Sequence, residues 1–387
     1  MIRSLLLLGS IGLTKVLLAQ GFQNNYGAGK FEEGVAVTSD GNAITTIVRH
    51  YREGYGHGLQ LLRTSLTGTN PITIDVPLPG AVFPQHAVPA EGGDLVVCGS
   101  IIPSGRYDQD ALLVRISAVG TLLWLWTSND ADGNEEFLSI DALEDGWAVG
   151  GEWRHGADSD GLLARFTSNG EPSWQQHYGS ANDERATGVA HDAGGLVIVG
   201  SNTFPVGNSQ FDHDAWAIRT DLDGNQQWQI TLGGAGEDQA SDVAASGNGS
   251  FVWAGHTRTW PLDDTTANGE RLAHAWLVAI DLFGDTLWTR TFGDITFNRY
   301  AGTITVLPDG GDLLVAGAYG SGHRSEALVM RTGPTGDLQW ERTYTVQRSS
   351  LIRALTSLPD GGFAAAGKCT GPQGGQTLLM RKNGNGQ

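Results

Sequence analysis

The stretch "FQNNYG" at residues 22–27 closely matches "WQQHYG" at residues 174–179, with Phe22 in the position of Trp174. The chain stops at "RKNGNGQ", residues 381–387, where Arg381 and Gly386 repeat the spacing that elsewhere precedes a Trp. That Trp would fall beyond the last residue, and Phe22 supplies an equivalent. The sequence therefore predicts six internal repeats and a seventh shared between the two ends of the chain.

Two anchors define the repeat. The first is a Trp four residues after a Gly, at Trp124, Trp174, Trp228, Trp288 and Trp340. The second is a Gly-rich turn before a short apolar run that ends in Gly, as in "GGLVIVG" up to Gly200. Each repeat, about 50 residues long, holds four short apolar runs bounded by turn residues, and no run shows helical periodicity. We therefore expect an all-β fold for residues 20–387, a seven-bladed β-propeller of four-stranded antiparallel blades. Pairing of the N-terminal strand with the C-terminal blade is expected to close it.

The repeated residues are expected to have structural roles. The aromatic residues Phe22, Trp124, Trp174, Trp228, Trp288 and Trp340 should cover the gaps between blades, and Ile72 takes the Trp position in the first copy. An Arg five residues before the repeat Gly, present in six of the seven copies, should help to pack the blades together. A residue found in nearly every blade does not mark one unique site, so departures from the repeat are more informative.

The segment "GGAGEDQASDVAASGNGSFVWAGHT" with "DAWAIRTDLDG" resembles the bacterial beta-propeller repeat of the SBBP type, found in secreted and surface proteins. The Gly-x-x-x-Trp element is also similar to the tryptophan-docking motif of quinoprotein-like propellers. These resemblances imply the propeller fold and leave the function open, because propellers serve as enzymes and as scaffolds. No adjacent Cys pair matches the quinoprotein pattern.

The composition limits location and partners. The net charge is −18, which argues against nucleic acid as a partner, since phosphates need clusters of Lys and Arg. Residues 1–19, "MIRSLLLLGSIGLTKVLLA", are typical of a secretory signal peptide, an apolar N-terminal strand being the alternative. No later run reaches the roughly 20 apolar residues of a transmembrane segment. We expect a monomer that is secreted, periplasmic or on the cell surface. Cys98 and Cys369 fall in blades separated by a third, so both thiols should stay free.

Candidate ligand-binding residues lie in the loops that vary most between repeats. These loops meet at one face of the predicted ring, and variable loops on a rigid scaffold are the usual place for binding. The acids, histidines and aromatic residues expected there are Asp110, Asp160, Asp212, His213, Asp214, His256, His274, Glu326, Trp153 and Trp260.

This residue set fits several chemistries. Carboxylates could hold a divalent cation such as Ca²⁺ or a basic ligand, although their repetition favours a structural role in opening strands and capping turns. His213, with His256 and His274 in the next blade, is the best cluster for metal binding or acid–base work, and Trp153 and Trp260 could stack on a sugar or peptide. No catalytic motif is present, so we expect a non-catalytic binding or scaffold module for a protein or glycan, with no cofactor. The alternatives are a polysaccharide hydrolase or lyase, and a quinoprotein-like oxidoreductase.

Overall fold

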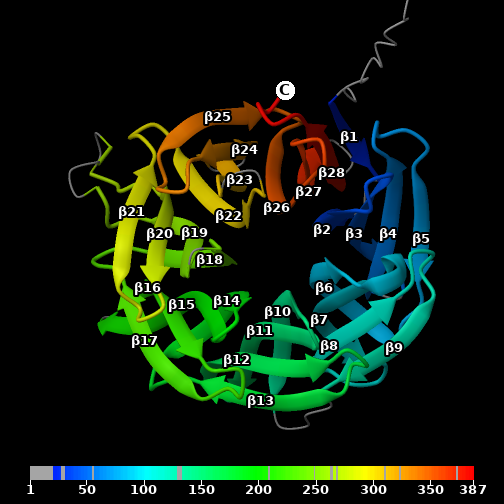
Figure 1. The fold of residues 1–387 in the computed structure, drawn as a ribbon, viewed down its shortest axis with the longest axis horizontal. Coiled ribbons are helices and arrows are strands. Elements are labelled where there is room, and N and C mark those ends of the chain that lie inside the picture. The colour runs from blue at the N-terminus through cyan, green and yellow to red at the C-terminus, as the bar shows by residue number, and fades with distance from the viewer. Residues whose placement is uncertain are drawn as a thin grey trace, which may run out of the picture.

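The computed structural model describes residues 21–27, 31–54, 56–128, 133–207, 210–247, 249–261, 265–266, 269–308, 311–321, 324–371 and 374–387. Their strands form seven four-stranded antiparallel sheets, arranged as blades around a central axis (Figure 1). Within these ranges one turn of 3-10 helix, Glu91–Gly93, is the only helical element. No helix in the described part of the chain is long and apolar enough to cross a membrane. The predicted seven-bladed propeller is confirmed, and the predicted signal peptide, residues 1–19, lies outside the described residues.

Each blade runs from an inner strand at the axis to an outer strand at the rim, and we number the blades 1 to 7 from the one that holds β2. The inner strands are β2 (Glu32–Ser39), β6 (Gly80–Pro89), β10 (Asn134–Leu143), β14 (Asp183–Asp192), β18 (Asp238–Ala245), β22 (Asn298–Val306) and β26 (Ser349–Ser357). The second strands are β3 (Ala43–Arg52), β7 (Leu95–Pro103), β11 (Gly146–His155), β15 (Gly195–Gly207), β19 (Ser250–Thr257), β23 (Leu313–Ser321) and β27 (Phe363–Gly371).

The third strands are β4 (Gly56–Ser65), β8 (Asp110–Ile116), β12 (Asp158–Thr167), β16 (Gln210–Thr220), β20 (His274–Asp281), β24 (Arg324–Thr332) and β28 (Gly374–Lys382). The outer strands are β5 (Ile72–Val76), β9 (Leu122–Thr127), β13 (Pro172–Tyr178), β17 (Gln226–Leu232), β21 (Thr286–Phe292), β25 (Leu338–Tyr344) and β1 (Phe22–Tyr26). Because consecutive strands are antiparallel, successive connections alternate between the two faces of the ring.

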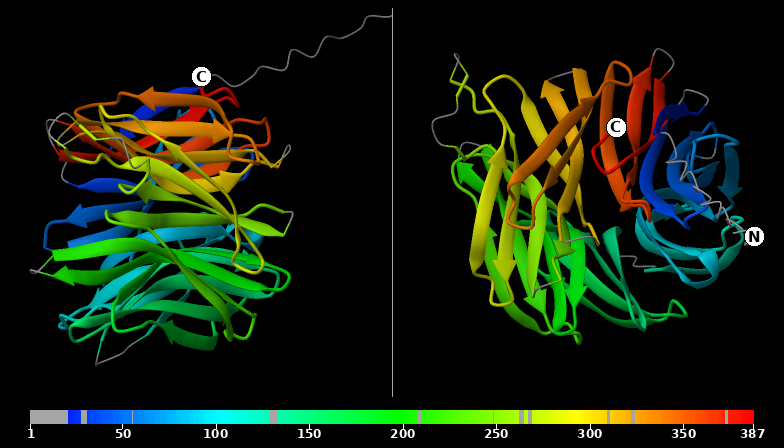
Figure 2. Two further views of the ribbon diagram at one scale, coloured as in Figure 1. Left: turned by 90° about the vertical axis from the view of Figure 1, so that its left-hand side faces the viewer. Right: turned by 45° about the horizontal axis from the view of Figure 1, so that its top comes forward.

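Blade 7 joins the two ends of the described chain. Its outer strand β1 pairs with β28, from Phe22 opposite Arg381 to Tyr26 opposite Thr377. Figure 2 shows this blue strand beside the red C-terminal strands from two further directions. The predicted closure is confirmed, and pairing β1 covers the edge that β28 would otherwise expose.

Adjacent blades are fastened where a tryptophan meets a turn. The Gly of each repeat lies in the turn between the third and outer strands with φ between +71° and +87°, a conformation that glycine adopts without strain. A Cβ at Gly224 would lie 3.1 Å from the Trp174 ring of the preceding blade, and Trp174 Nε1 donates to the Leu222 carbonyl at 3.0 Å. Trp228 makes the same contacts with Gly284 and with the Leu282 carbonyl. The predicted role of these tryptophans between blades is confirmed.

The first and last blades use variants of this contact. Phe22 lies against Gly68 of blade 1, and the hydroxyl of Tyr26 donates to the Gly68 carbonyl at 3.0 Å. Ile72 pairs with Arg63 as Trp174 pairs with Arg165, but its side chain is exposed. Ile74, two residues along on the same face of β5, contacts Gly120 instead. Ile72 thus holds the predicted Trp position in the strand pairing, while the contact with the next blade comes from Ile74.

The repeated arginines stabilise turns within their own blades. Each pairs with an Asp in or next to the turn between its blade's first and second strands, as Arg63 does with Asp40 at 2.6 Å and Arg115 with Asp94 at 2.9 Å. The same pairs are Arg165–Asp145, Arg219–Asp192, Arg331–Asp312 and Arg381–Asp360. Of these arginines, Arg165 and Arg331 also donate to a backbone carbonyl of the next blade, those of Leu222 and Gly384. The arginines were predicted to pack the blades together, but their main contact is an ion pair within each of the six blades that carry one.

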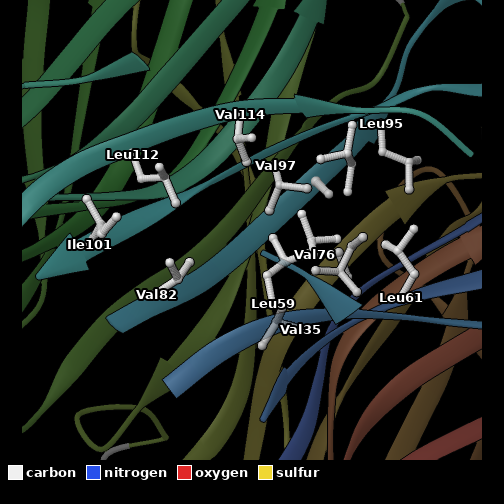
Figure 3. Packing of buried hydrophobic residues seen from close by; sticks show 14 residues of the cluster. Val35, Leu59, Leu61, Val76, Val82, Leu95, Val97, Ile101, Leu112 and Val114 are labelled. Atoms are coloured by element: carbon white, nitrogen blue, oxygen red, sulfur yellow. The ribbon is translucent and has the colours of Figure 1, made fainter. Parts of the chain in front are cut away.

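The apolar core lies between blades. Figure 3 shows the cluster between blades 1 and 2, where Leu59 and Leu61 of β4 face Val82 of β6 and Val97 of β7. Six further clusters repeat this arrangement around the ring. Cys98 and Cys369 are buried and free, as predicted. The core makes the ring a rigid frame for the loops at its two faces.

Candidate functional site

All ten candidate residues lie at one face of the ring. We call it the variable face. It consists of the connections between second and third strands and those from an outer strand to the next blade's inner strand. Asp110, Asp160, Asp214, His274 and Glu326 stand at or near the start of a third strand, and Trp153 and His256 stand near the end of a second strand. We call the opposite face, which holds the connections that contain the repeat glycines, the turn face. The sequence located the residues correctly on one face, while their contacts were not predicted.

Asp160, Asp214 and His274 occupy equivalent positions and share one contact. Each side chain fills the space beneath a glycine that follows the outer strand of its own blade. A Cβ at Gly179 would lie 1.7 Å from Asp160 Oδ1, and one at Gly233 would lie 1.8 Å from Asp214 Oδ1. His274, 2% exposed, lies beneath Gly293 in the same way. These three residues are packed against their own loops rather than directed toward a common ligand.

Asp214 has a second carboxylate close by. Burial raises the pKa of Asp214 to about 6, and the negative charges of Asp238 and Asp212 add to the shift. Asp238 is fully buried and accepts hydrogen bonds from Thr259 Oγ1 at 2.7 Å and from the Gly234 N–H at 3.0 Å. The neighbouring Asp238 carboxylate therefore opposes ionisation of Asp214.

Asp110 and Glu326 have local partners. Asp110, 1% exposed, accepts hydrogen bonds from Arg106 Nη1 at 3.1 Å and Nη2 at 3.2 Å. Glu326 accepts a hydrogen bond from Thr345 Oγ1 at 2.5 Å. The charge of Asp110 is therefore neutralised inside its own blade, whereas Glu326 lines a hollow between blades 6 and 7.

The histidine cluster predicted around His213 does not assemble. His213 Nδ1 lies 2.8 Å from Thr203 Oγ1, and Asp212 accepts a hydrogen bond from the His213 backbone N–H at 2.9 Å. His256 lies 3.8 Å from Glu237 Oε1, with its ring against Tyr300. Among the described residues no group of three or more His, Cys, Asp or Glu side chains is placed to hold a metal ion. Calcium binding remains a prediction, which a melting scan with and without EDTA would test.

The two candidate tryptophans differ in what surrounds them. Trp153 is stacked with two imidazoles, those of His177 at 4.4 Å and His155 at 5.1 Å between ring centroids. Trp260 packs at 5.6 Å against Trp276, and the two rings line a hollow of about 360 Å³ with Leu232 and three threonines of β21. The Trp260 ring therefore borders an open apolar hollow, whereas the Trp153 ring is already stacked with two histidines.

Three further hollows open on the variable face. One, of about 530 Å³, lies between blades 1 and 2 beside His57. A second, of about 420 Å³, lies between blades 3 and 4 and is lined by Glu152, Arg154, Arg185 and His213 among others. A third, of about 630 Å³, lies between blades 6 and 7 and includes Tyr319 and Glu326. The face therefore offers several separate recesses of a size that fits small ligands.

The central channel holds polar residues that were not predicted from the sequence. A cavity of about 380 Å³ lies there, lined by all seven inner strands, with half-buried His86 and Asp242 in its wall. Burial lowers the pKa of His86 and raises that of Asp242, while their opposite charges partly offset both shifts. Nearby, His191 and Asp141 form an ion pair at 2.6 Å, and the hydrogen bond that His191 Nδ1 donates to Asp141 raises the pKa of His191.

These channel side chains join neighbouring inner strands. Asp242 Oδ2 accepts from the Ile304 N–H of the next blade at 3.0 Å, and His86 Nδ1 accepts from the Ile140 N–H of its next blade at 3.3 Å. Each acceptor follows the β-bulge found in every inner strand. A sequence signal existed, because the equivalent position is otherwise small: Ala36, Ser139, Gly188, Thr303 and Ala354. His86 and Asp242 are departures from the repeat at that position.

Comparison with known proteins gives information about the fold but not about the function. No family model matches the chain, and no curated protein matches it in sequence. A puromycin hydrolase variant complexed with PGG is similar in structure, with a TM-score of 0.56 and 15% identity over 92% of this chain and 54% of that one. The chain thus spans about half the length of that hydrolase.

Two other solved structures match over nearly their whole length. An alpha-L-arabinanase from Penicillium chrysogenum complexed with arabinobiose has a TM-score of 0.52 and 9% identity, covering 92% of this chain and 93% of that one. The beta-propeller domain of the Trilobed protease from Pyrococcus furiosus has a TM-score of 0.51 and 8% identity, covering 92% and 96%. At such identities the likeness shows the fold alone, and the resemblance to SBBP-type repeats stays a prediction.

Proposed function

We propose that this protein is a secreted or cell-surface binding module, which holds a protein or glycan at its variable face without catalysing a reaction on it. The observation that supports this most is the set of three recesses on that face, of about 420 to 630 Å³. They lie between different pairs of blades, so a rigid ring presents several contact points to one large ligand.

The state of the charged groups on this face also supports binding over catalysis. Burial alone would raise the pKa of Glu33, but Arg353 at 2.9 Å and Arg49 at 2.5 Å outweigh it and hold that pKa below its usual range. His256 and Arg258 lower the pKa of Glu237 to about 2. Carboxylates fixed as anions by neighbouring cations suit recognition better than proton transfer near neutral pH.

The alternative function is a hydrolase or lyase acting on polysaccharide. Its general acid would be a carboxyl group with a raised pKa, and Asp214 has one. However, Oδ1 of Asp214 faces Gly233, and the described linings of the three recesses do not include this residue. The quinoprotein-like oxidoreductase would need a cofactor pocket, to which we assign no residues.

Binding to a panel of immobilised glycans tests the proposal. His57→Ala, His213→Ala and Tyr319→Ala each alter one recess, and Val119→Ala and Phe283→Ala alter exposed turn-face residues as controls. We expect bound glycans to lose affinity in at least one recess variant and in neither control. Product released from a bound glycan, with the release abolished by Asp214→Ala or His274→Ala, would replace the binding function with the enzymatic one.

Secretion is tested separately. Expression of the full chain in a bacterial host, followed by N-terminal sequencing of the exported protein, should give Gln20 as the first residue. A chain retained in the cytoplasm with Met1 intact would contradict the proposed location.

A further inference from the structure

The recess between blades 6 and 7 is lined by two arginines that make no ion pair with a described residue, whereas the two arginines of the recess between blades 3 and 4 pair with Glu152. We call the former the arginine recess. Its lining consists of Phe297, Tyr319, Gly320, Arg324, Ser325, Glu326, Thr345, Gln347 and Arg348. At about 630 Å³ it is the largest of the three recesses, within the usual size range of small-ligand sites.

Two arginines line the recess in a protein whose net charge is −18. Arg324 and Arg348 are exposed, and neither guanidinium group makes a hydrogen bond or ion pair with another described residue. A third arginine beside them, Arg299, is already neutralised, with Asp294 at 3.2 Å and Glu341 at 3.3 Å. Two planar guanidinium groups with unused donors are what a ligand carboxylate needs for paired hydrogen bonds.

Aromatic rings form the apolar part of the lining. Phe297 and Tyr319 meet edge to face with centroids 5.2 Å apart, and the guanidinium of Arg299 lies over the Tyr319 ring at 5.2 Å. These contacts hold both rings in place before a ligand arrives. Fixed aromatic rings suit a ligand that has one apolar face and polar edges, as a pyranose ring has.

The single acid in the lining favours a ligand with hydroxyl groups. Glu326 accepts one hydrogen bond, from Thr345 Oγ1, and its carboxylate can accept more. A ligand hydroxyl would donate to it, whereas a second ligand carboxylate would be repelled by it. The lining therefore combines two cations for one carboxylate, an acceptor for hydroxyls and an aromatic wall.

We propose that the arginine recess binds a uronate unit of an acidic oligosaccharide. The uronate carboxylate lies between Arg324 and Arg348, its hydroxyls reach Glu326, and its apolar ring face lies on Phe297 and Tyr319. This site rests on the proposed binding function and specifies its ligand class. An acidic peptide fits less well, because its repeated carboxylates would meet Glu326 and it lacks the hydroxyl pattern.

Calorimetric titration with trisaccharides of galacturonate, glucuronate and mannuronate tests the site, with the methyl ester of each as a matched neutral ligand. We expect at least one acid form to bind and its ester to bind at least tenfold more weakly. Arg324→Gln and Arg348→Gln should each weaken binding about tenfold to a hundredfold, as loss of a charge-assisted hydrogen bond does. Arg290→Gln, on outer strand β21, removes an exposed arginine elsewhere and should leave affinity unchanged.

The outcomes separate this site from the proposed function. Absence of binding by all three acid forms, equal binding of acid and ester, or full affinity in Arg324→Gln and Arg348→Gln with unchanged melting temperatures would each overturn the site. Tighter binding of an Asp- and Glu-rich peptide than of every uronate would also overturn it. Binding of other glycans at the remaining recesses would leave the binding function standing. Cleavage of a bound uronate chain would keep the site and reject the non-catalytic function.

Discussion

The indole of Trp228 is held at two points, which a repeat pattern alone does not reveal. Its Nε1 donates to the Leu282 carbonyl at 2.8 Å, and its ring lies against Gly284 of the next blade. The ring is half-buried, so contact removes roughly 100 Å² from water and stabilises by about 2–3 kcal/mol at about 25 cal/mol per Å². The spacing of Gly and Trp was visible in the sequence, but the partner of each Trp lies about 50 residues away.

Trp228→Ala should therefore lower the free energy of unfolding by about 2–3 kcal/mol, less than the 3–5 kcal/mol typical of a fully buried aromatic ring. Urea denaturation followed by circular dichroism measures it. Leu287→Ala, an exposed outer-strand substitution, should cost under about 0.5 kcal/mol. Equal costs for the two variants would mean that Trp228 does not fasten blades 4 and 5.

Asp214 gives a pH-dependent prediction. Because its pKa is raised to about 6 in the folded protein, ionisation above that pH opposes folding, and its effect disappears as the pH falls below about 4. Asp214→Asn should raise the melting temperature at pH 7.5, by an amount equivalent to about 1 kcal/mol after allowance for solvent screening, and should have little effect at pH 4. Asp223→Asn, an exposed turn substitution, serves as the control. The same stabilisation at both pH values would show that Asp214 is not destabilised by its neighbours.

The candidate residues show why a site is harder to predict than a strand. Sequence position placed Asp160, Asp214 and His274 correctly at the start of third strands. It did not show that glycines after the outer strands would lie directly over them, since that contact depends on how each loop folds back. Arg324 and Arg348 were overlooked because neither stands at a repeated position.

At the scale of elements, the strands were predictable because seven copies repeat the same turn signals. The β-bulge in every inner strand was not, because the extra residue differs in each copy, as Leu138 and Ser241 do. The bulge frees a backbone N–H, which an acceptor on the inner strand of the preceding blade can satisfy. His86 and Asp242 satisfy such groups, which explains large polar residues in an otherwise small position.

The contact between a tryptophan and the turn that joins a third strand to an outer strand can be tested by substituting Gly224, with Gly105, between a second and a third strand, as the control. Gly224 and Gly105 both have φ of +84°, but an added Cβ would approach Trp174 at Gly224 and would have nothing within 4 Å at Gly105. Gly105→Ala should cost about 1 kcal/mol for the left-handed backbone alone. Gly224→Ala should cost about 1 kcal/mol more, because the Trp174 ring must shift. Thermal melting measures both, and identical losses would rule out the contribution of docking.

At the scale of the whole molecule, β1 decides whether the ring is closed. Its removal frees five paired residues of β28 and removes the contacts of Phe22 and Tyr26 with Gly68. Blade 7 would then have three strands with an open edge. Prediction of this closure from sequence succeeded because the two terminal fragments complement each other within one repeat.

A chain that starts at residue 28 should melt at least 10 °C below the chain that starts at residue 20, since blades 7 and 1 lose their shared contact. A synthetic peptide of residues 20–27, added in excess, should recover part of the loss. Phe22→Ala with Tyr26→Phe, which keeps the backbone pairing, should fall between the two. A truncated chain that melts within 2 °C of the longer one would refute closure as a source of stability.

The junction in blade 7 also brings Gly21 next to Gln387, whose carbonyl oxygen would lie 2.9 Å from a Cβ at position 21. A short linker could therefore join these two residues, and the polypeptide could be cut anew between any other pair of blades. The rearranged gene would encode the same annulus with every sheet built from consecutive strands. Such permutants would move the seam where the chain ends meet, now β1 against β28, to a chosen junction between blades.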